Sequence, residues 1–393
     1  MSIPSILRSL TLCLASSSAG YSLSRRTSSL LRSHNSRLVA RNFASMVDTA
    51  DPPRVAVIGA GAAGLVAIRS LRDAGLRVSC FDAQPEPGGV WRYRPEGVLY
   101  RGLVTNLPKQ IMQFLDYPFP KEARSFLTHQ DVFNYLRNYA RDHDLLSLVG
   151  FSCAVTAVRG AQTPSRAAPG GYAWLVTHRR LEAVADGKAT GGAPSSAEAD
   201  VTELFDAVVV CNGHYERSSI PRIPGLDDRY SGRILHSRDY DAPEPFRGQR
   251  VLCIGARASG TDLAREISEV AKEVRVCDTS VTETTRGGAG HNIWRHPAIT
   301  AFSGGTAVSF ADGSAADVDA VVLCTGFDYD FPFLEAENGG DGGLVRAADR
   351  RVAPLYLQLF HAAYPTLSFV GLPHSVVPFP LFELQARREW QKE

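Results

Sequence analysis

The chain has few cysteines, and no two of them stand close together in its 393 residues. The seven are Cys13, Cys80, Cys153, Cys211, Cys253, Cys277 and Cys324. None forms the C-x-x-C or C-x-x-x-x-C spacing of zinc sites and redox-active thiol pairs. Histidines, cysteines and aspartates show no metal-ligand spacing either, so no metal site is expected. Several cysteines fall in or beside short apolar runs, and we interpret them as small buried hydrophobes in a reducing compartment.

The chain also lacks an excess of charge of either sign. It holds 42 basic and 41 acidic residues. Residues 1–47 contain six of the arginines and no acid, so the remainder has 36 basic against 41 acidic residues and a net charge of −5. Because this remainder has no basic stripe, we do not expect it to bind nucleic acid.

Residues 1–50 differ in composition from the rest of the chain. They are rich in serine, arginine and leucine but lack the long apolar run of a transmembrane segment. This composition is typical of a transit peptide and predicts a mitochondrial or chloroplast protein. Two alternatives stay open. The segment is a disordered extension, or translation starts at Met46 and gives a cytoplasmic form.

A glycine-rich turn follows the apolar run 54–58. It consists of Gly59, Ala60, Gly61, Ala62, Ala63 and Gly64. In a dinucleotide-binding unit, such glycines permit a tight turn, let the backbone approach a pyrophosphate and bring the next helix close to the strand. A helix that ends near Gly75 and a strand at 77–81 are predicted next. Asp82 then stands where a carboxylate accepts the ribose hydroxyls.

A second turn of this kind follows the apolar run 250–254 and precedes a predicted helix at 261–270. It consists of Gly255, Ala256, Arg257, Ala258, Ser259 and Gly260. Arg257 replaces the middle glycine; it hinders close approach of the backbone but supplies a guanidinium that could bind phosphate. Two interpretations stay open, a second dinucleotide site or a half-fold that binds nothing.

Two such turns in one chain indicate a flavoenzyme whose flavin is reduced by a nicotinamide. The missing thiol pair counts against the disulfide-reductase branch of these enzymes. No Ser/His/Asp triad or pair of carboxylates stands out in the sequence. That absence fits a reaction whose chemistry belongs to the cofactor.

Four further segments carry a resemblance to a known family. Residues 230–240 read YSGRILHSRDY and match the pattern F-x-G-x-x-x-H-x-x-x-Y/F except at the first aromatic residue. Residues 86–91 contain a GG-x-W turn, residues 105–108 read TNLP and residues 378–385 read PFPLFELQ. Together with the glycine turns, these segments resemble the flavin-containing monooxygenases over residues 54–390. The likeness is strongest to the plant group that includes S-oxygenases of glucosinolates.

The resemblance implies a reaction and a set of site residues. NADPH reduces FAD, the reduced flavin captures O₂ as a C4a-hydroperoxide, and a soft S or N nucleophile of a small molecule takes the distal oxygen. The implied FAD residues are the first turn and Asp82, Val90, Trp91, Thr105 and Asn106, and the implied NADP residues are the second turn. Asn106 is implied as the catalytic residue, with a hydrogen bond to the oxygenated flavin or the retained NADP⁺. A simple Asx-turn is its alternative role.

Three departures from the family pattern matter. Asp82 stands in place of the usual glutamate. Thr279 stands where relatives carry an arginine for the 2′-phosphate of NADP, and Asp278 before it would repel that phosphate or favour NAD. We expect NADPH to remain preferred, with Arg257 or Arg286 in compensation, and NADH stays open as the alternative. The chain stops at residue 393, where family members usually continue, which suggests a truncated product. Two alternatives therefore stay open, an uncoupled NAD(P)H oxidase that releases hydrogen peroxide and a non-catalytic remnant that folds around FAD.

The predicted fold is α/β, with two Rossmann-like dinucleotide-binding domains and the smaller NADP domain inserted into the larger FAD domain. We assign residues 51–216 and 326–393 to the FAD domain and residues 217–325 to the NADP domain. Residues 159–203 are expected to form a hairpin excursion with a long flexible tip. The other predicted elements are a helix at 130–143 and strands at 151–158, 173–177, 206–211 and 319–324.

Overall fold

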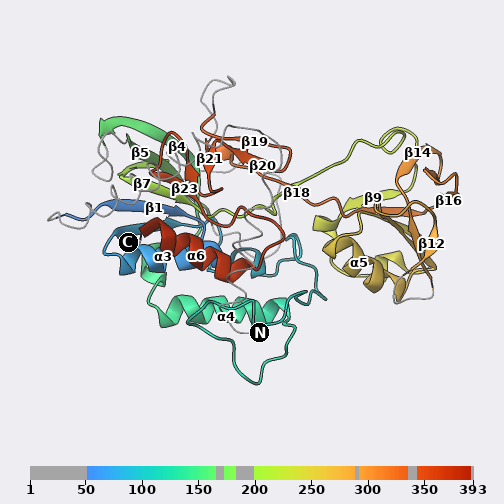
Figure 1. Ribbon diagram of the computed structural model, residues 1–393, viewed down its shortest axis with the longest axis horizontal. Helices are drawn as coiled ribbons and strands as arrows, with labels where there is room; N and C mark the ends of the chain where they lie inside the picture. The colour runs from blue at the N-terminus through green and yellow to red at the C-terminus, as the bar shows by residue number, and fades with distance from the viewer. Residues whose placement is uncertain (1–50, 165–171, 183–198, 288–291, 335–342, 391–393) are drawn as a thin grey trace, which may run out of the picture.

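The computed structural model describes residues 51–164, 172–182, 199–287, 292–334 and 343–390. They form two α/β units that lie side by side and are joined by two connecting segments (Figure 1). We call the unit that contains the first glycine turn the first unit, and the unit that contains the second turn the second unit. The leader, predicted as a transit peptide, lies outside the described residues.

The first unit is built on a seven-stranded sheet with the order β21-β22-β23-β7-β1-β2-β3. Its strands are β1 (Arg54–Ile58), β2 (Arg77–Phe81), β3 (Val149–Gly150), β7 (Ala207–Val210), β21 (Leu355–Tyr356), β22 (Phe360–His361) and β23 (Leu367–Phe369). Strands β23, β7, β1, β2 and β3 run parallel. Since β23 lies near the end of the chain, the sheet is completed by residues on both sides of the second unit.

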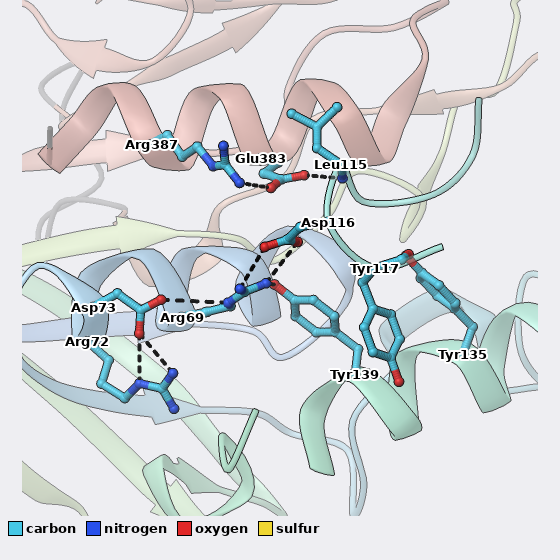
Figure 2. Close-up of polar contacts among 10 residues, drawn as sticks. All are labelled: Arg69, Arg72, Asp73, Leu115, Asp116, Tyr117, Tyr135, Tyr139, Glu383 and Arg387. Atoms are coloured by element: carbon cyan, nitrogen blue, oxygen red, sulfur yellow. Dashed lines mark hydrogen bonds and ion pairs between the residues drawn. The ribbon is translucent and has the colours of Figure 1, made fainter. Parts of the chain in front are cut away.

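Three helices, α3 (Ala62–Asp73), α4 (His129–Asp142) and α6 (Pro378–Trp390), pack below this sheet, with α3 and α6 side by side (Figure 1). Figure 2 shows the polar contacts that hold them. Arg69 of α3 donates to both carboxylate oxygens of Asp116, at 3.0 and 2.7 Å, and to Tyr139 of α4. Glu383, buried on α6, accepts from the backbone N–H of Leu115 at 2.6 Å. The PFPLFELQ segment thus begins a helix that is fixed against the helix of the first turn.

The described part of residues 159–203 belongs to a three-stranded antiparallel sheet of β4 (Cys153–Pro164), β5 (Tyr172–Arg180) and β6 (Val201–Phe205). Strands β4 and β5 pair as a hairpin, as predicted, and β6 adds a third strand that was not predicted. Trp174 and Phe205 are buried against the first unit, and Trp174 Nε1 donates to Thr366 Oγ1 at 2.9 Å. The low-complexity stretches 165–171 and 183–198 lie outside the described residues.

The second unit is built on a six-stranded sheet with the order β12-β13-β11-β10-β17-β9. Its strands are β9 (Arg233–His236), β10 (Arg250–Ile254), β11 (Glu273–Cys277), β12 (Thr285–Arg286), β13 (Ile293–His296) and β17 (Ala320–Leu323). Only β12 runs antiparallel to its described neighbour. Helix α5 (Ala258–Ser268) begins three residues before the predicted Thr261, because the end of the glycine turn is its first helical turn.

The remaining elements connect or extend the two units. In the second unit, β14 (Ile299–Gly304), β15 (Ala307–Phe310) and β16 (Ala315–Asp317) form an antiparallel sheet. In the first, β19 (Arg346–Ala348) pairs with β20 (Arg351–Ala353). Between the units, β8 (Arg217–Ser218) pairs with β18 (Phe327–Asp328), so the outgoing and returning segments lie together.

Two aspartates predicted as strand residues instead precede β7 and β17. Asp206 accepts a hydrogen bond from the backbone N–H of Arg54 at 2.9 Å. Asp319 accepts one from the backbone N–H of Arg250 at 2.8 Å and also pairs with its guanidinium. Each unit therefore ties the start of its central strand to the same kind of carboxylate.

Candidate functional site

The first turn has room only for glycine at its two ends. Gly59 has a φ of +100°, and a Cβ atom there would lie 2.6 Å from the carbonyl oxygen of Cys211. A Cβ on Gly64 would lie 1.8 Å from the carbonyl oxygen of Gly59. Helix α3 begins at this turn without a side-chain cap on Gly61, so the amides of its first turn remain available to a phosphate.

Asp82 is buried where β2 ends and faces the first turn. Its carboxylate accepts hydrogen bonds from the backbone N–H groups of Ala60 and Gln84. Burial raises the pKa of the Asp82 carboxyl above its ordinary value, and these two donors oppose the rise. A carboxylate has about four lone-pair sites, so two bonds leave acceptor capacity for ribose hydroxyls. The substitution of aspartate for the usual glutamate therefore preserves the chemistry of this position.

The GG-x-W segment lies directly against the first turn. The backbone N–H of Gly88 donates to the carbonyl oxygen of Ala60 at 3.1 Å. Gly89, with a φ of +56°, approaches so closely that a Cβ there would lie 2.9 Å from Cα of Gly61. Val90 and Trp91 follow in a short 3₁₀ helix (Gly89–Trp91) and are half-buried. The structure thus brings Val90 and Trp91 next to the turn, as expected of flavin-side residues.

Thr105 and Asn106 stand on a segment whose backbone is held by Thr105. The Thr105 backbone N–H donates to Leu127, while Oγ1 donates to the carbonyl oxygen of Leu107 and accepts from the Leu127 N–H, both at 2.9 Å. Asn106 is exposed, and its amide makes no hydrogen bond to any described residue. The Asx-turn considered from the sequence does not form. The local turn uses the threonine, so the Asn106 amide is free to bind another molecule.

The second turn repeats the geometry of the first at both end glycines. Gly255 has a φ of +111°, and its Cβ would lie 2.5 Å from the carbonyl oxygen of Cys324. A Cβ on Gly260 would lie 1.8 Å from the carbonyl oxygen of Gly255, the same clash as in the first turn. Arg257 takes the N-cap position of α5 and is exposed. The second turn therefore differs from the glycine pattern only at its middle position, Arg257, and its strand-turn-helix structure is intact.

The second turn lies near the first unit. Burial lowers the pKa of His374, which follows β23, and the positive charges of Arg350 and Arg257 lower it further. The segment that carries His374 approaches the start of α3, since a Cβ on Gly371 would lie 3.4 Å from Cβ of Ala63. The segment after β23 thus packs on the start of α3, and the charge of Arg257 in the second turn acts on His374 in that segment.

The end of β11 carries the groups that would meet the adenosine ribose of a nicotinamide cofactor. Asp278 is buried; Oδ1 accepts from the backbone N–H and Oγ of Ser280, which together with the charge of Arg295 lower its pKa. Arg295 Nη2, from the neighbouring strand β13, lies 3.4 Å from Asp278 Oδ2. Thr279 is exposed. Arg295 is a cation at this corner that the sequence did not reveal.

His236, the histidine of the YSGRILHSRDY motif, is a fixed hydrogen-bonding group. It is buried, with Nδ1 3.1 Å from Ser218 Oγ and Nε2 3.0 Å from the carbonyl oxygen of Gly326. Burial lowers its pKa. These two partners lie on the outgoing and returning connections, so His236 holds the second unit to both.

Within the described residues, no three histidine, cysteine or acidic side chains are grouped so that they could hold a metal ion. No helix in the same part of the chain is long and apolar enough to span a membrane. All six cysteines of the described residues are free thiols and are buried.

Comparison with known proteins identifies relatives over most of the chain. Residues 52–285 match the family model described as flavin-binding monooxygenase-like. Flavin-containing monooxygenase FMO GS-OX-like 4 of Arabidopsis thaliana is 38% identical over 362 residues, which cover 85% of this chain and 74% of the relative. The solved S-allyl-L-cysteine S-oxygenase from Allium sativum is 36% identical, with a TM-score of 0.74 over 85% of this chain and 75% of that one.

The fold and the two turns define a flavoprotein with two dinucleotide-binding units. The chain belongs to the flavin-binding monooxygenase-like family and is a flavin-dependent monooxygenase that uses FAD and NADPH. The predicted family, α/β fold and cofactors are confirmed. The residues fit both cofactors, since no Cβ is tolerated at the end glycines of either turn. Asp82 can accept the ribose hydroxyls of FAD, and beside Asp278 the guanidinium of Arg295 is the cation that suits the 2′-phosphate of NADPH. Which individual residues contact FAD and NADPH stays a prediction.

Proposed function

We propose that this enzyme oxygenates soft sulfur or nitrogen nucleophiles of small molecules, with small thioethers as its preferred class. Bound FAD would supply the chemistry, since reduced flavin reacts with O₂ to a C4a-hydroperoxide that transfers its distal oxygen to a nucleophile. NADPH would provide the two electrons. The protein would orient the two cofactors and exclude water from between them.

Asn106 is the observation that carries this proposal. Its amide is exposed, has no hydrogen bond to any described residue and stands on a backbone that Thr105 holds in place. An amide with no hydrogen bond to the described protein, on a backbone that is held in place, can donate a hydrogen bond to an oxygen that carries developing charge. We assign it the role of protecting the oxygenated flavin from collapse to hydrogen peroxide.

The relatives support sulfur as the preferred atom. The solved structure with a TM-score of 0.74 is an S-allyl-L-cysteine S-oxygenase, at 36% identity. A thioether sulfur is polarizable and attacks an electrophilic oxygen without a general base. This chemistry fits a sequence in which no Ser/His/Asp triad stands out.

The test supplies the purified protein with FAD, NADPH and ¹⁸O₂ and offers S-allyl-L-cysteine or a small tertiary amine. We expect the sulfoxide to contain one ¹⁸O atom and to form in a ratio close to one per NADPH consumed, faster than the amine oxide. Equal amounts of NADPH loss and hydrogen peroxide, with no oxygenated product, would instead identify an uncoupled oxidase. A protein that cannot be loaded with FAD would identify a remnant.

We also propose that residues 1–50 direct the protein to a mitochondrion or chloroplast. The support is compositional, because this segment combines six arginines with serines and has no acid before Asp48. Fusing residues 1–50 to a fluorescent protein tests the proposal. Uniform cytoplasmic fluorescence would contradict it.

A further inference from the structure

The segment between the GG-x-W turn and Asn106 crosses to the second unit and makes hydrogen bonds to Asp241 there. Tyr93 Oη donates to Asp241 Oδ1 and Arg101 Nη2 donates to Asp241 Oδ2, both at 2.7 Å. The backbone N–H of Arg101 also donates to the carbonyl oxygen of Asp241 at 3.1 Å. Both carboxylate oxygens of Asp241 are thus held by the first unit, although Asp241 directly follows the motif that ends at Tyr240.

Aromatic packing and a glycine extend this contact to helix α5. The rings of Tyr100 and Tyr240 meet edge to face at 5.6 Å between centroids. Tyr240 is buried, and its hydroxyl donates to Glu266 Oε2 of α5 at 3.0 Å. Gly102 approaches the same carboxylate so closely that a Cβ there would lie 2.5 Å from Glu266 Oε1. We call these seven residues the seam.

The seam joins two parts of the site that are far apart in the sequence. Glu266 lies on α5, whose first turn is the end of the second glycine turn. On the other side, the chain turns at Leu103, whose N–H donates to the carbonyl oxygen of Tyr100, and reaches Thr105 and Asn106 within a few residues. One short segment is therefore fixed to the first unit at Thr105 and to the second unit at Arg101.

We propose that the seam positions the NADPH-binding unit against the segment that carries Asn106, with Asp241 as the positioning residue. While the first unit holds Asp241, the distance between α5 and Asn106 is fixed. The nicotinamide and the Asn106 amide would then be placed at the flavin at the same time. The part that concerns Asn106 rests on the proposed oxygenation; the part that concerns the nicotinamide rests only on FAD and NADPH as cofactors.

Charge exchange tests the seam, because the double variant can restore the ion pair that each single variant breaks. Arg101→Asp places two carboxylates against each other, Asp241→Arg places two guanidinium groups there, and the double variant restores an ion pair of reversed direction. Tyr93→Phe removes one hydrogen bond and serves if a charge variant fails to fold. Arg179→Asp is the matched control, because Arg179 pairs with an aspartate at the same 2.7 Å on β5, outside the seam.

The measurement is the anaerobic rate of flavin reduction by NADPH, together with FAD content, the Kd for NADPH and the melting temperature. Because misplacement by about 1 Å can cost roughly a hundredfold in rate, we expect each single charge variant to reduce its flavin at least about tenfold more slowly. FAD content and Kd should stay within about twofold of the unaltered protein, and the double variant should recover most of the rate. Tyr93→Phe should slow reduction less, in the same direction.

Three results would overturn the inference. One is an unchanged rate of flavin reduction in the single charge variants. If the charge variants do not fold, an unchanged rate in Tyr93→Phe has the same meaning. Another is a loss that the double variant does not recover. The last is a loss that follows only the melting temperature, as a merely structural contact would give. Failure of the proposed oxygenation is separate, since it would leave anaerobic reduction intact and abolish only the oxygenated product.

Discussion

Replacement of Gly260 by alanine gives the sharpest separation of the two cofactor sites. The new Cβ would lie 1.8 Å from the carbonyl oxygen of Gly255 and 2.8 Å from its carbonyl carbon. Both are backbone atoms, so no side-chain rotation relieves the contact. Real Cβ contacts essentially never fall below 3.0 Å, so α5 and the turn must separate by about 1 Å or more.

Gly260→Ala should impair the use of NADPH by the second unit and leave FAD binding by the first unit intact. A displacement of this size at a phosphate-binding turn is expected to cost between about tenfold and a hundredfold in flavin reduction by NADPH. The first turn is untouched, so the protein should stay yellow with a full complement of FAD. Anaerobic stopped-flow reduction over a range of NADPH concentrations measures both the limiting rate and the apparent Kd.

Two further variants make the result interpretable. Gly64→Ala produces the same 1.8 Å clash in the first turn, and we expect it to lose FAD. Gly160→Ala on β4 meets no atom within 4 Å and should change neither site. Reduction of Gly260→Ala at the unaltered rate would refute the assignment of the second turn to NADPH.

Three other predictions follow from the structure. Asn106→Ala removes no protein hydrogen bond, so we expect unchanged melting and FAD content but more hydrogen peroxide per NADPH; a peroxide assay with unchanged yield would remove Asn106 from the proposed mechanism. Arg295→Gln leaves Asp278 without its cation and should raise the Kd for NADPH about tenfold but that for NADH much less, measured by fluorescence titration. Asp319→Asn should lower stability at neutral pH, because Arg250 holds the Asp319 pKa below its ordinary value. That stabilisation is present above the ordinary aspartate pKa and disappears as the pH falls through the lowered one, so melting curves of the two proteins should converge in acid.

The sequence predicted the central strands best. The bounds expected from the apolar runs 54–58, 77–81 and 250–254 agree with β1, β2 and β10. A short apolar run that is bounded by glycines is assigned as a buried strand by its length and by those glycines. The glycine turns were predictable for the same reason, since both the spacing and the positive φ are local properties.

Other parts of the fold depend on contacts that no local pattern shows. The start of α5 was placed too late because Ala258 and Ser259 resemble the end of a loop, whereas close packing of Gly260 on Gly255 draws them into the helix. The sheet β4-β5-β6 was underestimated because its low-complexity connections hid the burial of Trp174.

The seam and the cation at β11 could not be predicted from the sequence either. Tyr93, Arg101 and Asp241 are polar residues without a motif, and only the tertiary fold brings them within 2.7 Å. Arg295 lies on the strand next to Asp278 for the same kind of reason, because β11 and β13 are separated in sequence by a connection and an antiparallel strand.

The most direct test of a coupled monooxygenase is to mix the NADPH-reduced protein with O₂ in a stopped-flow spectrometer. The proposed function predicts a flavin species with the absorbance of a hydroperoxide that persists in the absence of substrate and decays faster when S-allyl-L-cysteine is added, with formation of the sulfoxide. Direct return to oxidised flavin with one hydrogen peroxide per NADPH, at a rate that the thioether does not change, would contradict it.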